Sequence, residues 1–72
     1  MKEAQRTGII SASQAILALR IKEIREGLGF TQAHFALKLG VSSASVVNRW
    51  EKGFTKPSPL ALRKLRELGR LD

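Results

Sequence analysis

Cysteine and tyrosine are absent from this chain of 72 residues, and acidic residues number only six. Without cysteine the chain has no disulfide, no thiolate nucleophile and no Cys-based zinc site. The single histidine, His34, has too few carboxylates around it in the sequence to predict a metal site. We find no activated nucleophile and no acid–base pair, so neither an enzyme nor a bound cofactor is expected.

Long apolar runs are missing as well. No stretch approaches the ~18 residues that a membrane span requires, and the first residues do not resemble a secretion signal. These absences favour a soluble, cytoplasmic protein that does not enter a membrane.

Negative charge is scarce, because 13 Lys and Arg face six Asp and Glu, which gives a net charge of +7. Residues 37–72 hold eight of these basic residues against three acids, a net +5, whereas residues 1–36 have a net +2. A basic domain attracts polyanions, of which nucleic acid is the commonest. A solvated surface that keeps the chain soluble would explain the charge alone equally well.

The apolar residues are mostly Leu, Ile, Val and Ala, and no stretch alternates as a strand would. We therefore predict an all-α fold, a compact bundle of four or five helices. Residues 1–12 are predicted to be a flexible N-terminal segment and residues 13–72 the folded domain. A domain of this size has a small core, near the lower limit for independent folding.

The first helix is predicted to begin at Ser11 or Ser13, because Ser11 and Gln14 fit a capping box. Gly27 and Gly29 mark its end, one of them as a left-handed cap. Its apolar residues recur at steps of three to five, which predicts a buried stripe. The stripe comprises Ala12, Ile16, Leu17, Ile21, Ile24 and Leu28.

The second helix is predicted to be capped by Thr31 and ended by Gly40. Its buried face comprises Phe35, Ala36 and Leu39, and its outward residues include Gln32, Ala33 and Lys38. Val41 fills the turn that follows. The third helix then begins after Ser42 or Ser43 and runs to about Lys52, before Gly53.

The third helix has one apolar and one polar side. Helical spacing places Ala44, Val47, Trp50 and Glu51 on the first side, and Ser45, Asn48, Arg49 and Lys52 on the second. Arg can donate two hydrogen bonds to guanine, and Asn can match adenine, in the major groove of DNA. The predicted base-edge residues are Ala44, Ser45, Val46, Asn48 and Arg49. An ordinary solvated helix face is the alternative.

Phosphate contacts are predicted at helix N-termini and in the loop after the third helix. Unpaired N–H groups and the helix dipole favour anions at a helix N-terminus. The candidates are Thr31, Gln32, Ser43, Lys52 and Lys56. Plain helix capping and loop solubility would account for the same residues.

The fourth helix is predicted to start with Ser58 as cap and Pro59 at the first helical position. Its apolar stripe is Ala61, Leu62, Leu65 and Leu68, and Gly69 ends it. The face predicted to be exposed to solvent carries Arg63, Lys64, Arg66, Glu67 and Arg70.

Five motifs occur together in this order: residues 21–32, 35–36, 40–42, 50–53 and 56–57. In combination they resemble the lambda-repressor/Cro-type (XRE) helix-turn-helix family over roughly residues 18–68. The resemblance implies a bundle of four or five helices whose third helix reads the major groove. It also implies a prokaryotic-type transcriptional regulator that binds double-stranded DNA, as a homodimer on palindromic sites.

The resemblance further implies that Gln32 contacts a DNA phosphate and supports the third helix, the reading helix. It also implies that Arg25 and Glu51 form an internal ion pair. A pair of surface charges is the alternative for Arg25 and Glu51. The chain departs from the family in one spacing, because Trp50 lies ten residues after Gly40 instead of nine. We favour Ser43 as the cap, since it keeps Val47, Trp50 and Glu51 on the buried side, whereas a start at Ser42 would rotate Val46 inward and shift Trp50.

Two other functions also fit this sequence. An antitoxin of the same fold would repress its own operon and bind a toxin protein, with residues 1–12 or the Leu-rich fourth helix as weak candidates for the contact. The chain could also be a DNA-targeting or interaction module of a larger protein. Such a module, if it did not read bases, would bind DNA in a salt-sensitive way that ignores sequence. Little remains after Leu68 for a fifth helix, so the dimer surface is undetermined.

Overall fold

The computed structural model describes residues 11–69, which form four helices: α2 (Ala12–Gly27), α3 (Gln32–Leu39), α4 (Ala44–Glu51) and α5 (Pro59–Gly69). This range contains no strand, so the all-α prediction is confirmed. Residues 1–10 of the predicted flexible segment, and Arg70, lie outside the described residues. Ser11 and Ala12 belong to α2, as its cap and first residue, so this helix begins before residue 13.

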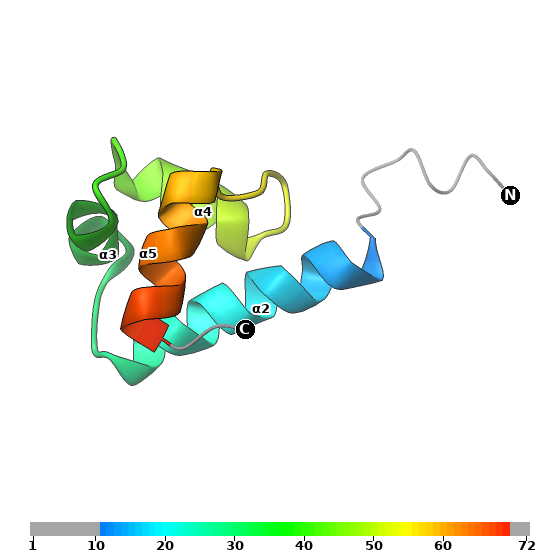
Figure 1. Ribbon diagram of the computed structural model, residues 1–72, viewed down its shortest axis with the longest axis horizontal. Helices are drawn as coiled ribbons and strands as arrows, with labels where there is room; N and C mark the ends of the chain where they lie inside the picture. Colours follow the sequence, from blue (N-terminus) through cyan, green and yellow to red (C-terminus); the bar gives the residue numbers. More distant parts are fainter. Residues whose placement is uncertain (1–10, 70–72) are drawn as a thin grey trace, which may run out of the picture.

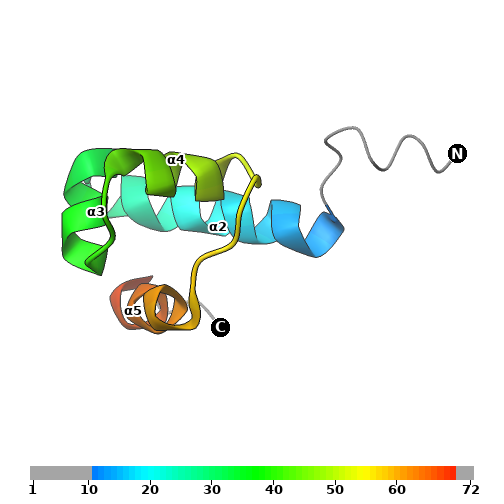
Figure 2. The same ribbon diagram turned by 90° about the horizontal axis from the view of Figure 1, so that it is seen from above.

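The helices are arranged around α2 and α3. Consecutive helices α3 and α4 pack on each other across a short turn, and α4 also packs on α2 (Figure 1). Helix α5 packs on α2 and α3, and Figure 2 shows it on the opposite side of the molecule from α4. As a result, the side of α4 that faces away from α2 and α3 is turned away from α5 as well.

The core takes one fully buried large side chain from each helix: Ile21, Phe35, Val47 and Leu65. Around these lie the buried side chains of Ala36, Leu39, Trp50 and Ala61, with six partly buried apolar residues packed against them. Because every helix contributes to one cluster, the helices are expected to fold as a single cooperative unit.

The predicted stripe of α2 is partly wrong. Ile21 is buried and Leu17 and Ile24 are partly buried, but Ala12, Ile16 and Leu28 are exposed, with Ile16 60% accessible. Ala18 is buried in their place. The physical reason is the helical period: Ile16 lies two residues, or about 200°, from Ala18, and therefore faces the other side.

The predicted helix starts are confirmed by hydrogen bonds. The hydroxyl oxygens of Ser11, Thr31 and Ser58 accept from the backbone N–H groups three residues further on, at 3.0–3.2 Å. At the other end of these helices, Gly29 follows α2 with φ 78° and Gly40 ends α3 with φ 74°. Residues with a Cβ rarely adopt this left-handed conformation, so glycine fits both positions.

No helix in the described range, residues 11–69, has both the length and the apolar character needed to cross a bilayer.

Two glycines at helix ends, Gly27 and Gly69, do not have a positive φ. Replacing each of them by alanine is expected to change the stability in opposite directions. A Cβ on Gly69 would lie 2.6 Å from Cγ2 of Ile24, whereas a Cβ on Gly27 would meet nothing within 4 Å. We expect Gly69→Ala to lower the free energy of unfolding by roughly 1–2 kcal/mol through crowding. Gly27→Ala should raise it by up to about 1 kcal/mol through helix propensity. Urea unfolding followed by circular dichroism measures both, and shifts of the same sign would contradict this packing.

Candidate nucleic-acid interface

The turn between α3 and α4 settles where the candidate reading helix begins. Ser43 is the extended residue before the helix (φ −164°, ψ 168°), and α4 starts at Ala44. The Ser43 side chain makes no capping hydrogen bond and is exposed, so its hydroxyl is available to a ligand. The additional residue between Gly40 and Trp50 is therefore accommodated before α4, as the Ser43 alternative predicted.

Helix α4 divides its side chains between the core and the surface. Val47 and Trp50 are buried on the side predicted to pack. Ser45, Arg49 and Lys52 are exposed, and Asn48 is half-buried at the edge of α3. The polar side of α4 is therefore turned mainly outward.

Three of the five residues predicted to contact bases are half-buried, namely Ala44 and Val46 in addition to Asn48. Ala44 and Val46 are half-buried, and Val46 packs against the hydrophobic core. Val46 and Trp50 are four residues apart and thus lie one turn apart on nearly the same face, which draws Val46 toward the core. Val46 is thus half-buried at the border of the two faces, as its expected position between them implies, and only part of its side chain faces solvent.

Arg25 and Glu51 form a two-point ion pair between α2 and α4. Nε of Arg25 donates to Oε2 of Glu51 at 2.6 Å and Nη2 donates to Oε1 at 3.1 Å. The side chains are only 13% and 5% exposed. Hydrogen bonding to Glu51 raises the pKa of Arg25 above its ordinary value, against the opposing effect of burial. The pair joins two helices through charged, mostly buried groups.

Gln32 is turned inward, although its side chain was predicted to look outward. It is half-buried, and its Nε2 donates to Oε1 of Glu51 at 3.1 Å. Because a carboxylate only accepts hydrogen bonds, this contact fixes which end of the Gln32 amide faces Glu51. The buried carboxylate thus takes donors from both α2 and α3, and Gln32 links α3 to the end of α4.

The same amide of Gln32 reaches toward the polar side of α4. Nδ2 of Asn48 donates to Oε1 of Gln32 at 3.5 Å, a long and therefore weak hydrogen bond. Asn48 uses one amide hydrogen in this contact, which leaves its second hydrogen and its Oδ1 for a ligand. A chain of polar contacts therefore runs from Arg25 through Glu51 and Gln32 to Asn48.

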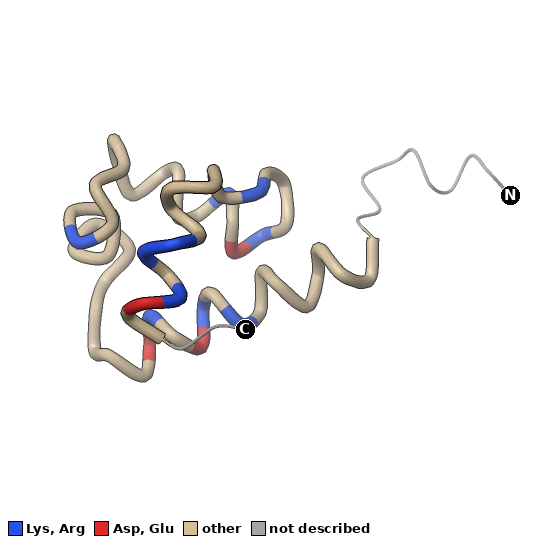
Figure 3. The backbone as a smooth tube through the Cα atoms, viewed as in Figure 1, with Lys and Arg blue, Asp and Glu red and all other residues tan. Residues whose placement is uncertain are grey.

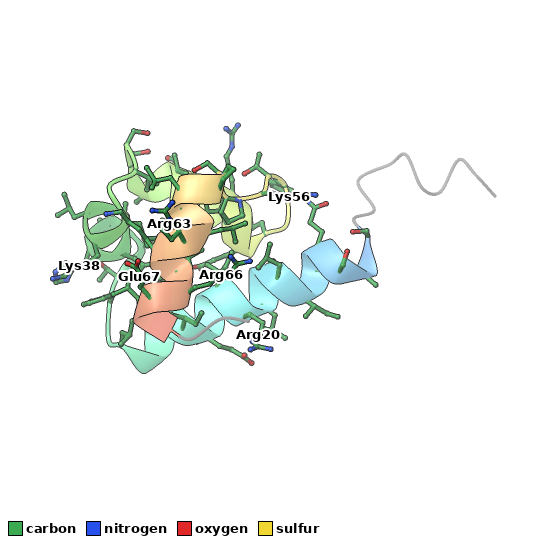
Figure 4. All side chains as sticks on the ribbon, in the orientation of Figure 1. Arg20, Lys38, Lys56, Arg63, Arg66 and Glu67 are labelled. Atoms are coloured by element: carbon green, nitrogen blue, oxygen red, sulfur yellow. The ribbon has the colours of Figure 1, made fainter. Side chains whose placement is uncertain are left out.

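The predicted phosphate-binding residues lie at the edges of this surface. Thr31 is exposed at the start of α3, and its hydroxyl caps the helix through the N–H of His34. Lys52 is exposed at the end of α4, and Lys56 is exposed on the loop that follows (Figure 4). Gln32 differs from these residues because its amide is committed to Glu51.

The charge of this region is strongly positive. Residues 32–58 contain four Lys or Arg and a single acid, Glu51, whose carboxylate is paired with Arg25. Figure 3 shows these basic residues on α3, on α4 and on the loop after α4. Lys38 lies apart, over the ring of Phe30 (Figure 4), so an anionic ligand on α4 would meet Arg49, Lys52 and Lys56 without an unpaired carboxylate between them.

One contact near this surface was not predicted. Nε2 of Gln14, on the first turn of α2, donates to the backbone oxygen of Gly53 at 2.8 Å. The spacing of Ser11 and Gln14 predicted a purely local capping box. Only one of the two hydrogen bonds of that box forms, from the Gln14 N–H to the Ser11 hydroxyl oxygen, since the Gln14 side chain is directed to Gly53, two residues after the end of α4. No local pattern in the sequence signals a partner 39 positions away.

A family model described as helix-turn-helix matches residues 21–70, more than half of the chain, and this range spans the ion pair, the turn and all of α4. No curated protein matches the chain. The chain belongs to the helix-turn-helix family of lambda-repressor/Cro (XRE) type and is a DNA-binding domain.

Proposed function

We propose that the chain is a sequence-specific double-stranded DNA-binding domain of a prokaryotic-type transcriptional regulator, with α4 as the helix that enters the major groove. The observation that carries this proposal is the exposed polar side of α4, on a helix whose opposite side holds the buried Val47 and Trp50. The major groove of B-DNA is wide enough to admit one α-helix. Such a regulator would act in the cytoplasm.

Arg49 and Asn48 are the residues proposed to carry most of the base recognition. Arg49 is exposed and its guanidinium can donate to both O6 and N7 of a guanine. Asn48 can accept from N6 of an adenine through Oδ1 and donate to N7 with its remaining N–H. Ser45 is exposed one turn earlier, and the accessible parts of Ala44 and Val46 can contact a thymine methyl.

Phosphate contacts are proposed on either side of α4. Thr31 and the first N–H groups of α3 flank one side, and the exposed hydroxyl of Ser43 lies just before α4. Lys52 and Lys56 supply positive charge after α4. Such contacts set the register of a protein on the duplex without reading its sequence.

Lys56→Ala should weaken binding to every DNA sequence by about the same factor, because the residue is proposed to contact phosphate alone. The slope of log K against log salt concentration should become less steep by the amount that one phosphate contact contributes. Titrations of a preferred and a scrambled duplex at several salt concentrations measure both effects. A loss confined to the preferred duplex would show that Lys56 contacts bases.

Selection of bound duplexes from a random pool tests the proposed function. We expect enrichment of a short motif containing guanine and adenine at the positions read by Arg49 and Asn48. Two inverted copies of the motif would indicate a homodimer on a palindromic site, as we propose. Binding without enrichment of any sequence would contradict sequence-specific recognition.

A further inference from the structure

The first turn of α2 contacts the end of α4 through Gln14. The hydrogen bond from Nε2 to the Gly53 oxygen measures 2.8 Å and is partly buried. Its partners are 39 residues apart, the largest separation among the side-chain hydrogen bonds of the described residues. It therefore fixes where the chain emerges from the candidate reading helix.

Gly53 has no partner for its carbonyl within its own turn. The N–H of Gly53 donates to Trp50 at 3.0 Å and the N–H of Phe54 donates to Arg49 at 2.9 Å. With φ 79° at Gly53, these two bonds form a Schellman motif, which uses the N–H groups of the turn. The carbonyl of this buried residue then needs a donor from elsewhere, and Gln14 supplies it.

The next three residues form an arch, which we define as residues 54–56, between two buried anchors. Gly53 and Pro57 are buried, whereas Phe54, Thr55 and Lys56 are all exposed. The arch offers a hydroxyl and an ammonium group, and residues 52–58 contain no acid. These are the groups that contact phosphate oxygens in protein–DNA complexes.

We propose that Gln14 is a positioning residue that holds the arch against the DNA backbone, without itself touching DNA. This inference rests on the proposed function. When the Gln14 bond is lost, the Gly53 carbonyl is free to turn toward water and the arch loses a fixed position. DNA binding must then order the arch, which lowers the affinity. Arg49 and Asn48 lie before the arch and are held by α4, so base preference should not change.

Gln14→Met removes the donor while keeping the length of the side chain. We expect it to weaken binding to a preferred duplex and to a scrambled duplex by the same factor, about 3- to 10-fold, the size of one lost hydrogen bond. The base preferences found by selection should stay as in the wild type. Ser13→Ala, at the neighbouring exposed position on α2, is the matched control and should alter both affinities less than 2-fold.

A double-mutant cycle separates positioning from a general loss of stability. If Gln14 acts through the arch, Gln14→Met should have little further effect in a Thr55→Ala/Lys56→Ala background, because both side chains that it positions are already gone. A full 3- to 10-fold loss in that background would overturn the inference, since a loss of overall stability would persist there.

Two further results identify which proposal is at fault. Wild-type affinity in Gln14→Met would overturn the inference and leave the proposed function intact. Failure of the wild-type protein to bind any duplex would overturn the proposed function, and the inference with it.

Discussion

Glu51→Ala is expected to lower the free energy of unfolding by about 3–5 kcal/mol, because it leaves the largely buried Arg25 guanidinium without its carboxylate. The Gln32 amide loses its acceptor at the same time. A domain of this length has a total stability of roughly 4–11 kcal/mol. The variant should therefore be largely unfolded at moderate urea concentrations, where circular dichroism still reports a folded wild type.

Glu26 provides the matched control for this experiment. Its carboxylate also lies near Arg25, at 3.8 Å, but the Glu26 side chain is 57% exposed. Water screens such a pair, so Glu26→Ala should cost less than about 1 kcal/mol. Equal losses in the two variants would show that burial of the Arg25–Glu51 pair does not determine its contribution.

Arg49→Ala is expected to cost about 1–3 kcal/mol in binding to the preferred duplex and to relax selection at one base pair, because two hydrogen bonds to guanine are lost. Binding to a scrambled duplex should fall much less, since only a general electrostatic attraction is removed. Competition titrations of the two duplexes measure the difference.

Arg63→Ala removes the same charge from α5 (Figure 4), the helix that Figure 2 shows on the opposite side of the molecule from α4. The control should alter binding to the preferred and scrambled duplexes alike, and only slightly. Equal losses on the two duplexes for Arg49→Ala would contradict its role in reading bases.

Local chemistry explains which parts of the fold were predictable from the sequence. Thr31 and Ser58 were correctly assigned as caps, and Ser11 is one of the two caps proposed for the first helix, because each hydroxyl accepts from an N–H only three residues away. Gly29 and Gly40 were correctly placed for the same reason, since the end of a helix determines the local φ.

Residues whose surroundings come from distant parts of the chain were less predictable. Ile16 is as apolar as Ile21, and only the packing of α3, α4 and α5 decides that Ile21 faces the core. Gln32 was expected at the surface, but the buried carboxylate of Glu51 attracts its amide. The contact between Gln14 and Gly53 depends on a packing geometry that no local sequence pattern contains.

The polar side of α4 is proposed to lie in the major groove when the protein is bound to DNA. The most direct test is a nuclear magnetic resonance experiment on the isotope-labelled protein bound to the selected duplex. We predict intermolecular nuclear Overhauser effects from Ser45, Asn48 and Arg49 to thymine methyl or cytosine H5 protons, which mark the floor of the major groove. If such contacts instead join the duplex to α5 or to the exposed side of α2, the assignment of α4 as the reading helix is wrong.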